Sequence, residues 1–265
     1  HDASGEHPAR VTVSANPRML ADADAALVLV KSYRTEEVSG MLAAALPPEA
    51  VVLTLQNGLG NVEVLATHLG QERVFGGATS QGAILEAPGV VRDSGSGPTV
   101  LGRADGKADP RLDDLAQALL LAGFAVSLTR DLEAALWGKA ILNAAINPVA
   151  ALTRLRNGQL AEHEPSLQLM TAAAREAWHV ARRHRVHIEE QDWRARLLTV
   201  CQATAPNLNS MLQDVLHGRQ TEIDAINGAI VRTAQQYRLP TPVNRTLWHL
   251  ISTVESTYHV QVTAD

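Results

Sequence analysis

One lysine and two asparagines recur at four-residue intervals in an otherwise apolar stretch of the chain. Residues 136–148 read LWGKAILNAAINP, and Lys139, Asn143 and Asn147 are the polar members. Residues four apart lie on the same face of an α-helix, so these side chains form one polar stripe. The strong helix formers predict a largely buried helix that ends at Pro148. Its stripe is either exposed or lines a wet cavity, and the cavity is favoured because exposed stripes usually carry several charges.

Two later stretches place hydrogen-bonding groups at the expected starts of helices. Residues 209–214, NSMLQD, begin a helix near Ser210, where backbone N–H groups and the helix dipole favour a carboxylate. Ser210 is equally suited to be a helix cap, and the two roles are compatible. Residues 221–228, TEIDAING, begin another helix with Glu222 in its first turn. Such a glutamate usually interacts with the helix dipole, but one that approaches a half-buried lysine can hold the ammonium and relay a proton.

The first half of the chain alternates strand-like and helical segments. Residues 25–30 and 51–55 are continuous apolar runs, as expected of strands buried on both faces, and helical spacing follows at 35–46 and 62–69. This β-α-β-α order predicts the parallel, doubly wound sheet of an α/β fold. A short strand pattern precedes it at 10–13. A partly antiparallel section should complete the sheet, with one helix at 110–121 and strands at 74–82, 89–93, 99–102 and 125–129.

Two loops at the ends of the predicted parallel strands carry polar side chains. Lys31 and Arg34 follow the first strand, and Asn57 follows the second within the loop QNGLG at 56–60. Open α/β sheets bind ligands at the carboxyl ends of their strands. The basic residues could therefore meet a phosphate, and Asn57 could offer its amide to a ring or a carbonyl. The alternatives are solvated basic residues and an ordinary Asn-Gly turn.

Helical periodicity dominates from Asp131 onward, and strand signals vanish. The expected helices cover residues 131–147, 166–184, 189–202, 210–217, 221–237 and 242–258. The chain is thus predicted to divide into an α/β domain at 1–130 and an all-α domain at 131–265.

The composition argues against several classes of protein. The formal net charge is −5 with no basic run, which disfavours nucleic acid or an anionic membrane as a partner. No apolar run is expected to span a bilayer. The single cysteine, Cys201, excludes an internal disulfide framework and suits a reducing cytoplasm. We expect it to be a small buried residue on a helix, and we expect no metal site.

Five motifs, in this order and at these spacings, resemble the ketopantoate reductase (2-dehydropantoate 2-reductase) family. They are LVLVK at 27–31, QNGLG at 56–60, LWGK…N…NP at 136–148, NSMLQD at 209–214 and TEIDAING at 221–228. The resemblance covers nearly the whole chain. It implies a Rossmann-type amino domain and a helical carboxyl domain, with NADPH and ketopantoate, a small 2-oxo acid, held between them. It also allows a homodimer.

The resemblance further implies roles for particular residues. Lys139 corresponds to the general acid, and Glu222 to the glutamate beside the lysine and the cofactor. The implied substrate-binding residues are Asn57, Asn143, Asn147, Asn157 and Ser210. The implied cofactor-binding residues are Lys31, Asn57, Gly82 and Glu222, with Gly82 contributing a backbone contact.

One element of the family is absent from the sequence. The family opens with a strand and a Gly-x-Gly-x-x-Gly turn that receives the pyrophosphate, and no such turn occurs among the 265 residues. Matching Lys31 to its family position leaves out roughly forty residues, the length of one βαβ unit. We therefore expect an N-terminally incomplete Rossmann-type domain, either in a fragment of a longer protein or in a chain that binds the cofactor weakly. A preference for NADP over NAD rests on the resemblance alone.

These observations predict the NADPH-dependent reduction of ketopantoate to pantoate, a step of pantothenate and coenzyme A biosynthesis. A hydride would reach the C2 carbonyl while Lys139 protonates the developing alkoxide. Two alternatives stay open. One is a related dehydrogenase of another 2-oxo acid. The other is a catalytically silent fragment whose helical domain acts as a binding or dimerisation module.

Overall fold

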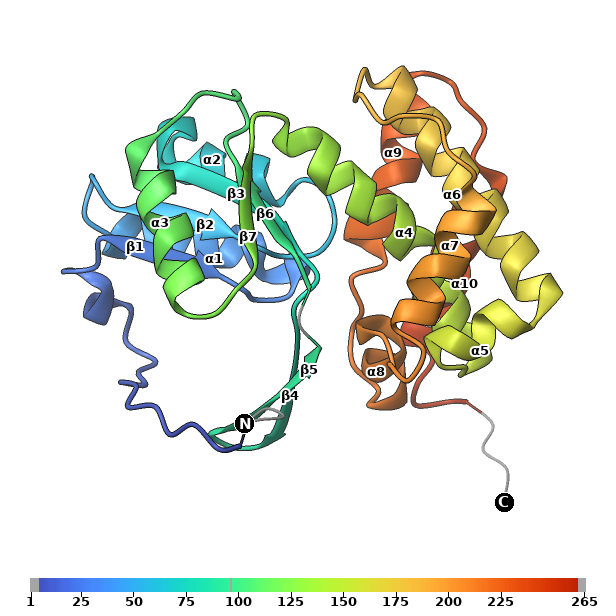
Figure 1. The fold of residues 1–265 in the computed structure, drawn as a ribbon, viewed down its shortest axis with the longest axis horizontal. Coiled ribbons are helices and arrows are strands. Elements are labelled where there is room, and N and C mark those ends of the chain that lie inside the picture. Colours follow the sequence, from blue (N-terminus) through green and yellow to red (C-terminus); the bar gives the residue numbers. More distant parts are fainter. Residues whose placement is uncertain (1–4, 96, 262–265) are drawn as a thin grey trace. The chain divides into compact units, whose positions relative to one another are not determined.

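The chain folds into two compact units (Figure 1). The computed structural model describes residues 5–95 and 97–261. Unit 1 comprises residues 1–56 and 60–135, and unit 2 comprises residues 57–59 and 136–265. The short loop 57–59 thus belongs with the helical unit, although it follows a strand of unit 1.

Unit 1 is built on a five-stranded sheet in the order β1-β2-β3-β6-β7. The strands pair in parallel except β3 and β6, which are antiparallel, so the predicted doubly wound sheet with an antiparallel section is confirmed. The strands are β1 (Ala25–Val28), β2 (Val51–Thr54), β3 (Val74–Thr79), β6 (Thr99–Gly102) and β7 (Val126–Thr129). The α-helices are α1 (Thr35–Ala45), α2 (Asn61–Leu69) and α3 (Pro110–Leu121), with short 3₁₀ turns at η1 (Pro17–Leu20), η2 (Ser32–Arg34) and η3 (Gln71–Arg73).

Strand β2 lies in the core of unit 1, and every one of its residues is buried. Val51 and Leu53 point to one face, where they pack in a cluster with Leu112 and Ala116 of α3. Val52 and Thr54 point to the opposite face, since side chains alternate along a strand. A continuous apolar run therefore suits a strand that is covered on both sides.

Strand β1 differs from the prediction. The sequence predicts that residues 25–30 are buried on both faces, but Leu27 in β1 is 49% exposed and Leu29, which follows the strand, is 64% exposed. The reason is that β1 is an edge strand, which pairs with β2 alone in the described part of the sheet. The strand expected at 10–13 is also wrong: Val11 and Val13 are exposed and take no regular structure.

A separate hairpin extends from unit 1 between β3 and β6. Strands β4 (Gly82–Ala87) and β5 (Val90–Gly95) pair antiparallel across a turn that contains Gly89 at φ 80°. The strand predicted at 74–82 includes only the first residue of β4, and the remainder of β4 was not predicted.

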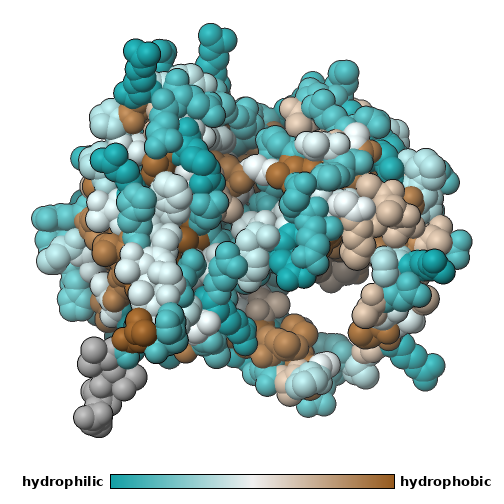
Figure 2. Space-filling model, turned by 180° about the vertical axis from the view of Figure 1, so that it is seen from behind, coloured by the Kyte–Doolittle hydropathy of each residue, from teal (hydrophilic) through white to brown (hydrophobic). Residues whose placement is uncertain are grey.

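Hydrophilic residues predominate on the face shown in Figure 2, with hydrophobic residues scattered among them.

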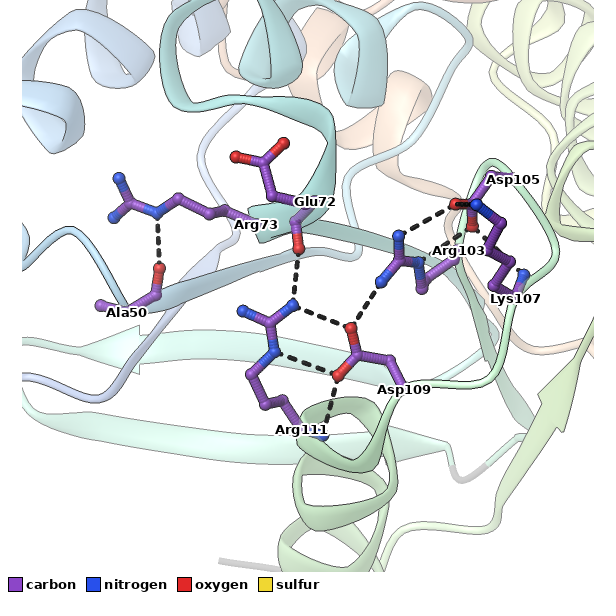
Figure 3. A network of polar contacts seen from close by, with 8 residues as sticks. All are labelled: Ala50, Glu72, Arg73, Arg103, Asp105, Lys107, Asp109 and Arg111. Atoms are coloured by element: carbon purple, nitrogen blue, oxygen red, sulfur yellow. Dashed lines mark hydrogen bonds and ion pairs between the residues drawn. The ribbon is translucent and has the colours of Figure 1, made fainter.

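An ionic network ties the start of α3 to the neighbouring loops (Figure 3). Asp109 caps α3 by accepting from the backbone N–H of Arg111 at 3.0 Å, and its carboxylate also accepts from the guanidinium groups of Arg111 and Arg103. Arg111 reaches on to the carbonyl oxygen of Glu72 at 2.8 Å. These donors, Arg111 first, hold the pKa of Asp109 well below its usual range. The network therefore serves the structure of unit 1.

Unit 2 is helical, as predicted from Asp131 onward. Its helices are α4 (Leu132–Thr153), which begins in unit 1, α5 (Asn157–Glu162), α6 (Glu164–Arg183), α7 (Trp193–Ala203), α8 (Ser210–Leu216), α9 (Ala229–Gln236) and α10 (Pro242–Ser256). A π-helical turn, η4 (Asp224–Gly228), leads directly into α9. Two details of the prediction are wrong: α5 was missed, and α7 starts at Trp193 because Asp192 caps the backbone N–H groups of Arg194 and Ala195.

Helix α4 does not end at Pro148 as predicted, but continues to Thr153. A proline inside a helix removes one N–H, and the carbonyl four residues earlier loses its partner. That carbonyl belongs to Ala144, and it accepts instead from the side-chain amide of Asn227 at 3.0 Å. The helix therefore passes through Pro148 because another element supplies the missing donor.

The continuation makes α4 longer and more apolar than the sequence analysis expected. Among the described residues it is the one helix long and apolar enough, by length and composition, to cross a membrane. However, 61% of its most apolar window is buried inside the protein. Buried helices of a protein core can have the same length and composition.

Candidate active site

The three polar residues predicted to form a stripe all lie on α4, and they differ in burial. Lys139 and Asn143 are half-buried, and Asn147 is buried. Burial lowers the pKa of Lys139 from 10.5 to about 8, while the carboxylate of Glu222 acts in the opposite direction. Burial disfavours the charged form of an amine, so this ammonium releases its proton more readily than a surface lysine does. Asn143 and Asn147 form no side-chain hydrogen bond within the described residues, which leaves their amides available to a ligand.

Glu222 is brought to Lys139 by a turn rather than by a helix. The prediction placed Glu222 in the first turn of a helix, but the residue precedes the π-helical turn η4. Its side chain is buried, and its carboxylate accepts from the amide of Asn57 at 3.2 Å. The structure therefore groups Lys139, Glu222 and Asn57, two of which are separated by 165 residues in the chain.

A close backbone approach holds the Asn57 loop against η4. The backbone N–H of Leu59 donates to the carbonyl of Ala225 at 2.8 Å. Gly58 has φ 90°, and a Cβ at this position would lie 2.7 Å from both Cβ and the carbonyl oxygen of Ala225. Only glycine fits such a contact and such a φ. From the sequence, Asn57-Gly58 is an ordinary turn dipeptide, and the family motif QNGLG at 56–60 is the one signal that could have indicated this contact.

Asn157 and Ser210 belong to a second polar group around the start of α8. The amide of Asn157 donates to the Thr204 hydroxyl at 2.9 Å and accepts from the side chain of Asn209 at 3.2 Å. Asn209 in turn caps α8 by accepting from the backbone N–H of Leu212. The suggestion that Ser210 is the cap is therefore wrong. The Ser210 hydroxyl is half-buried and has no side-chain hydrogen bond within the described residues.

Lys31 and Gly82 belong to unit 1, so the groups described in unit 2 do not include them. Lys31 follows β1, and its carbonyl accepts from the backbone N–H of Arg34 in η2. Gly82 pairs with Gly95 at the start of the β4–β5 hairpin, where a Cβ would lie 2.5 Å from the hydroxyl oxygen of Ser94. A rotation of the Ser94 hydroxyl would relieve this contact, so the hairpin alone does not require glycine at this position.

Two further features bear on the chemistry of the chain: its metal-ligating side chains and its single cysteine. Within residues 5–95 and 97–261, no group of three or more His, Cys, Asp or Glu side chains could hold a metal ion. Cys201 is fully buried on α7, and burial raises the pKa of its thiol to about 11. The prediction of a small buried residue on a helix is confirmed, and such a thiol is a poor nucleophile.

Comparison with known proteins gives consistent matches along the chain. Residues 1–106 match the family described as "Ketopantoate reductase PanE/ApbA", and residues 131–255 match "Ketopantoate reductase PanE/ApbA C terminal". The 2-dehydropantoate 2-reductase of Halobacterium salinarum is 38% identical over 91% of this chain and 79% of its own length. A PanE/ApbA family ketopantoate reductase structure from Ralstonia eutropha is 30% identical, with a TM-score of 0.87 over 97% of this chain and 84% of its own.

A more distant structure shares the fold. D-mandelate dehydrogenase, solved with NADH and anilino(oxo)acetate, is 23% identical, with a TM-score of 0.84 over 92% of this chain and 80% of its own. Relatives named 2-dehydropantoate 2-reductase, which match most of this chain, identify it as an oxidoreductase with a Rossmann-type sheet and a helical unit. The family matches and the 38% identity make the assignment specific. The chain belongs to the ketopantoate reductase family.

Proposed function

We propose that this protein reduces 2-dehydropantoate to pantoate with NADPH, and that Lys139 is the general acid. The observation that carries the proposal is the half-buried Lys139 ammonium, with a pKa of about 8, acted on by the buried Glu222 carboxylate. The family and its relatives named 2-dehydropantoate 2-reductase support the substrate. In cells the reaction would serve pantothenate and coenzyme A biosynthesis in the cytoplasm.

The state of Lys139 suits proton donation near neutral pH. With a pKa of about 8 the side chain is mostly ammonium at pH 7, yet it is a much stronger acid than a surface lysine. It polarises the C2 carbonyl of the oxo acid and protonates the oxygen as charge develops there. Such general-acid help typically contributes on the order of 10²–10⁴-fold to the rate. The Glu222 carboxylate favours the charged form of Lys139 and accepts a hydrogen bond from the side-chain amide of Asn57.

The amides and the hydroxyl of unit 2 are proposed to bind the substrate. Asn143 and Asn147 lie one and two helical turns after Lys139 on the same face of α4. Their amides could therefore bind the hydroxyl and the C2 carbonyl of ketopantoate near the ammonium. Asn57 would contact both substrate and cofactor. The Ser210 hydroxyl would donate to the substrate carboxylate. Asn157, which accepts a hydrogen bond from Asn209 next to Ser210, would help to bind the same carboxylate.

The residues present fit the nicotinamide end of a dinucleotide. Lys31 and Asn57 follow the carboxyl ends of β1 and β2, the edge at which such sheets bind ligands. Their ammonium and amide groups can meet a phosphate or a carboxamide, and Gly82 would offer its backbone. When bound, a reduced nicotinamide supplies the hydride. On this proposal residues 1–130 hold the cofactor, and residues 131–265 hold the substrate and could form a homodimer.

A panel of oxo acids tests the proposed function. Ketopantoate, 2-oxoisovalerate, pyruvate and phenylglyoxylate would each be offered with NADPH and with NADH, and the loss of nicotinamide absorbance recorded. We expect ketopantoate with NADPH to give the highest kcat/KM. A higher value for another oxo acid would indicate a related dehydrogenase. No turnover with any pair, while ligand still binds, would favour a silent binding module.

Replacing Ser210 with alanine is expected to raise KM for ketopantoate more than it changes the affinity for NADPH. A hydrogen bond to a charged group contributes about 1.5–3 kcal/mol, which corresponds to roughly ten- to more than a hundredfold in KM. Steady-state kinetics with a thermal melt would measure both effects. Ser166→Ala, near the start of α6, is the matched control and should leave KM unchanged. A fall in melting temperature with KM unmoved would contradict a substrate role for Ser210.

Asn157→Ala should differ from Ser210→Ala in one respect. Because the Asn157 amide bonds both Thr204 and Asn209, its loss should lower the melting temperature as well as raise KM.

A further inference from the structure

Asn227 links the turn that follows Glu222 to the helix that carries Lys139. Its side chain is fully buried, and its amide donates to the carbonyl of Ala144 at 3.0 Å. This is the carbonyl that Pro148 leaves without a helical partner. The bond therefore joins η4 to α4 at a point five residues after Lys139 and one residue after Asn143.

A buried network fixes the orientation of the Asn227 amide. Its nitrogen also donates to the side-chain oxygen of Asn244 at 3.1 Å, so both of its N–H groups are used. Asn244 is fully buried as well, and its own amide donates to the carbonyl of Ala173 and to the Glu176 carboxylate. The Asn227 side-chain oxygen has no partner within the described residues. The interactions that hold this amide in place are thus those of its nitrogen.

The backbone of η4 carries this constraint back to Glu222. Ile226 donates its N–H to the carbonyl of Glu222 at 3.1 Å, and Gly228 donates to Ile223 at 3.0 Å in the π-helical pattern. Asn227 lies between these two donors. A displacement of Asn227 relative to α4 would therefore move Glu222 relative to Lys139.

We propose that Asn227 is a positioning residue, which holds Glu222 at its working distance from Lys139 by bonding the carbonyl that Pro148 frees. The catalytic consequence rests on the function proposed above, whereas the structural consequence does not. Within the described residues, Glu222 is the charged side chain that acts on Lys139. If Asn227 no longer fixes Glu222, the ammonium loses part of its stabilisation and deprotonates at lower pH.

The small number of lysines allows a direct test without substrate. The sequence contains three, Lys31, Lys107 and Lys139, so ¹³C-labelled lysine gives three side-chain signals to titrate by NMR. The Lys139 signal should titrate at about 8. In Asn227→Ala its pKa should fall further, by about half a unit or more. With ketopantoate, kcat at pH 8 should fall about twofold or more, because the ammonium fraction falls, while KM changes less. Asn244→Ala, which leaves the Ala144 bond in place but frees the other N–H of Asn227, should lower the melting temperature and shift the Lys139 pKa less than Asn227→Ala does.

A second proline variant separates positioning from simple stabilisation. Pro148→Ala restores a backbone N–H that can donate to Ala144, but it does not join η4 to α4. We expect Pro148→Ala combined with Asn227→Ala to recover the melting temperature and to keep the lowered Lys139 pKa and kcat. If Asn227→Ala does not fold, the double variant is compared with Pro148→Ala alone. An unchanged Lys139 pKa in Asn227→Ala, or its full recovery in the double variant, would overturn the proposal. A silent enzyme leaves the NMR result intact, so the two failures are distinguishable.

Discussion

Replacing Lys139 with alanine is expected to lower kcat by about 10²-fold or more and to leave NADPH binding nearly unchanged. Lys139 is the acid in the proposed reaction, and it is the half-buried ammonium on which the Glu222 carboxylate acts. Without it the developing alkoxide loses its proposed proton donor. Steady-state turnover and titration of NADPH fluorescence would measure the two quantities separately.

The chain offers a matched control for this experiment. Lys107→Ala removes another lysine, whose side chain is 77% exposed and lies 3.7 Å from Asp105. It should leave kcat within a factor of about two, since an exposed ion pair contributes little. Equal turnover of the Lys139→Ala variant and the native protein would remove Lys139 from the mechanism.

The elements that the sequence predicted best are those with covered faces and clear end signals. Strand β2 and helices α1 and α2 lie where the apolar runs and their spacing placed them. Strand β1 has the same apolar pattern as β2, yet its Leu27 is exposed because the strand lies at the edge of the described sheet. A strand's place in its sheet depends on partners elsewhere in the chain, and the local pattern does not contain that information.

Helix α4 shows a second limit of local patterns. Proline is a strong stop signal because it removes a donor and crowds the preceding turn. At Pro148 the missing donor comes from Asn227, a residue 79 positions away in the numbering. A long-range hydrogen bond of this kind overrides the preference of proline for a helix end, and the residues near Pro148 do not indicate it. The π-helical turn η4 was hidden for the same reason, since its sequence reads as ordinary helix.

The candidate site was predictable in part. Periodicity alone placed Lys139, Asn143 and Asn147 on one helical face, which the structure shows. The approach of Glu222 to Lys139 and the bond between Asn57 and Glu222 depend on how distant segments pack. The resemblance to the family implies that Glu222 lies beside the lysine, whereas the bond between Asn57 and Glu222 was not predicted. The Gly58–Ala225 contact that holds the Asn57 loop was not anticipated.

The pH dependence of turnover should follow the titration of Lys139. In the proposed mechanism the ammonium is the active form, and burial lowers its pKa from 10.5 to about 8. We therefore expect kcat to be flat below pH 8 and to fall about tenfold per pH unit above it, as the fraction of ammonium falls. A surface lysine acting as the acid would instead keep the rate constant to about pH 10.

Glu222→Gln should move this alkaline limb to lower pH. The carboxylate raises the pKa of Lys139, so its loss leaves burial unopposed and lowers that pKa further. Glutamine has nearly the same shape and keeps an oxygen that can accept from Asn57, so the change is mainly one of charge. At pH 8 turnover should fall about tenfold, whereas at pH 6 it should fall much less. Profiles of kcat between pH 6 and 10 would measure both limbs.

Asp224→Asn is the matched control, because Asp224 follows Glu222 by two residues, is exposed, and pairs with Arg232 at 2.8 Å. Its loss removes one negative charge from the same turn without removing the group that acts on Lys139. The control profile should therefore match that of the native protein. If the Glu222→Gln limb stays at the native pH, or if Asp224→Asn shifts it equally, the field of Glu222 is not what keeps Lys139 charged, and its proposed role fails.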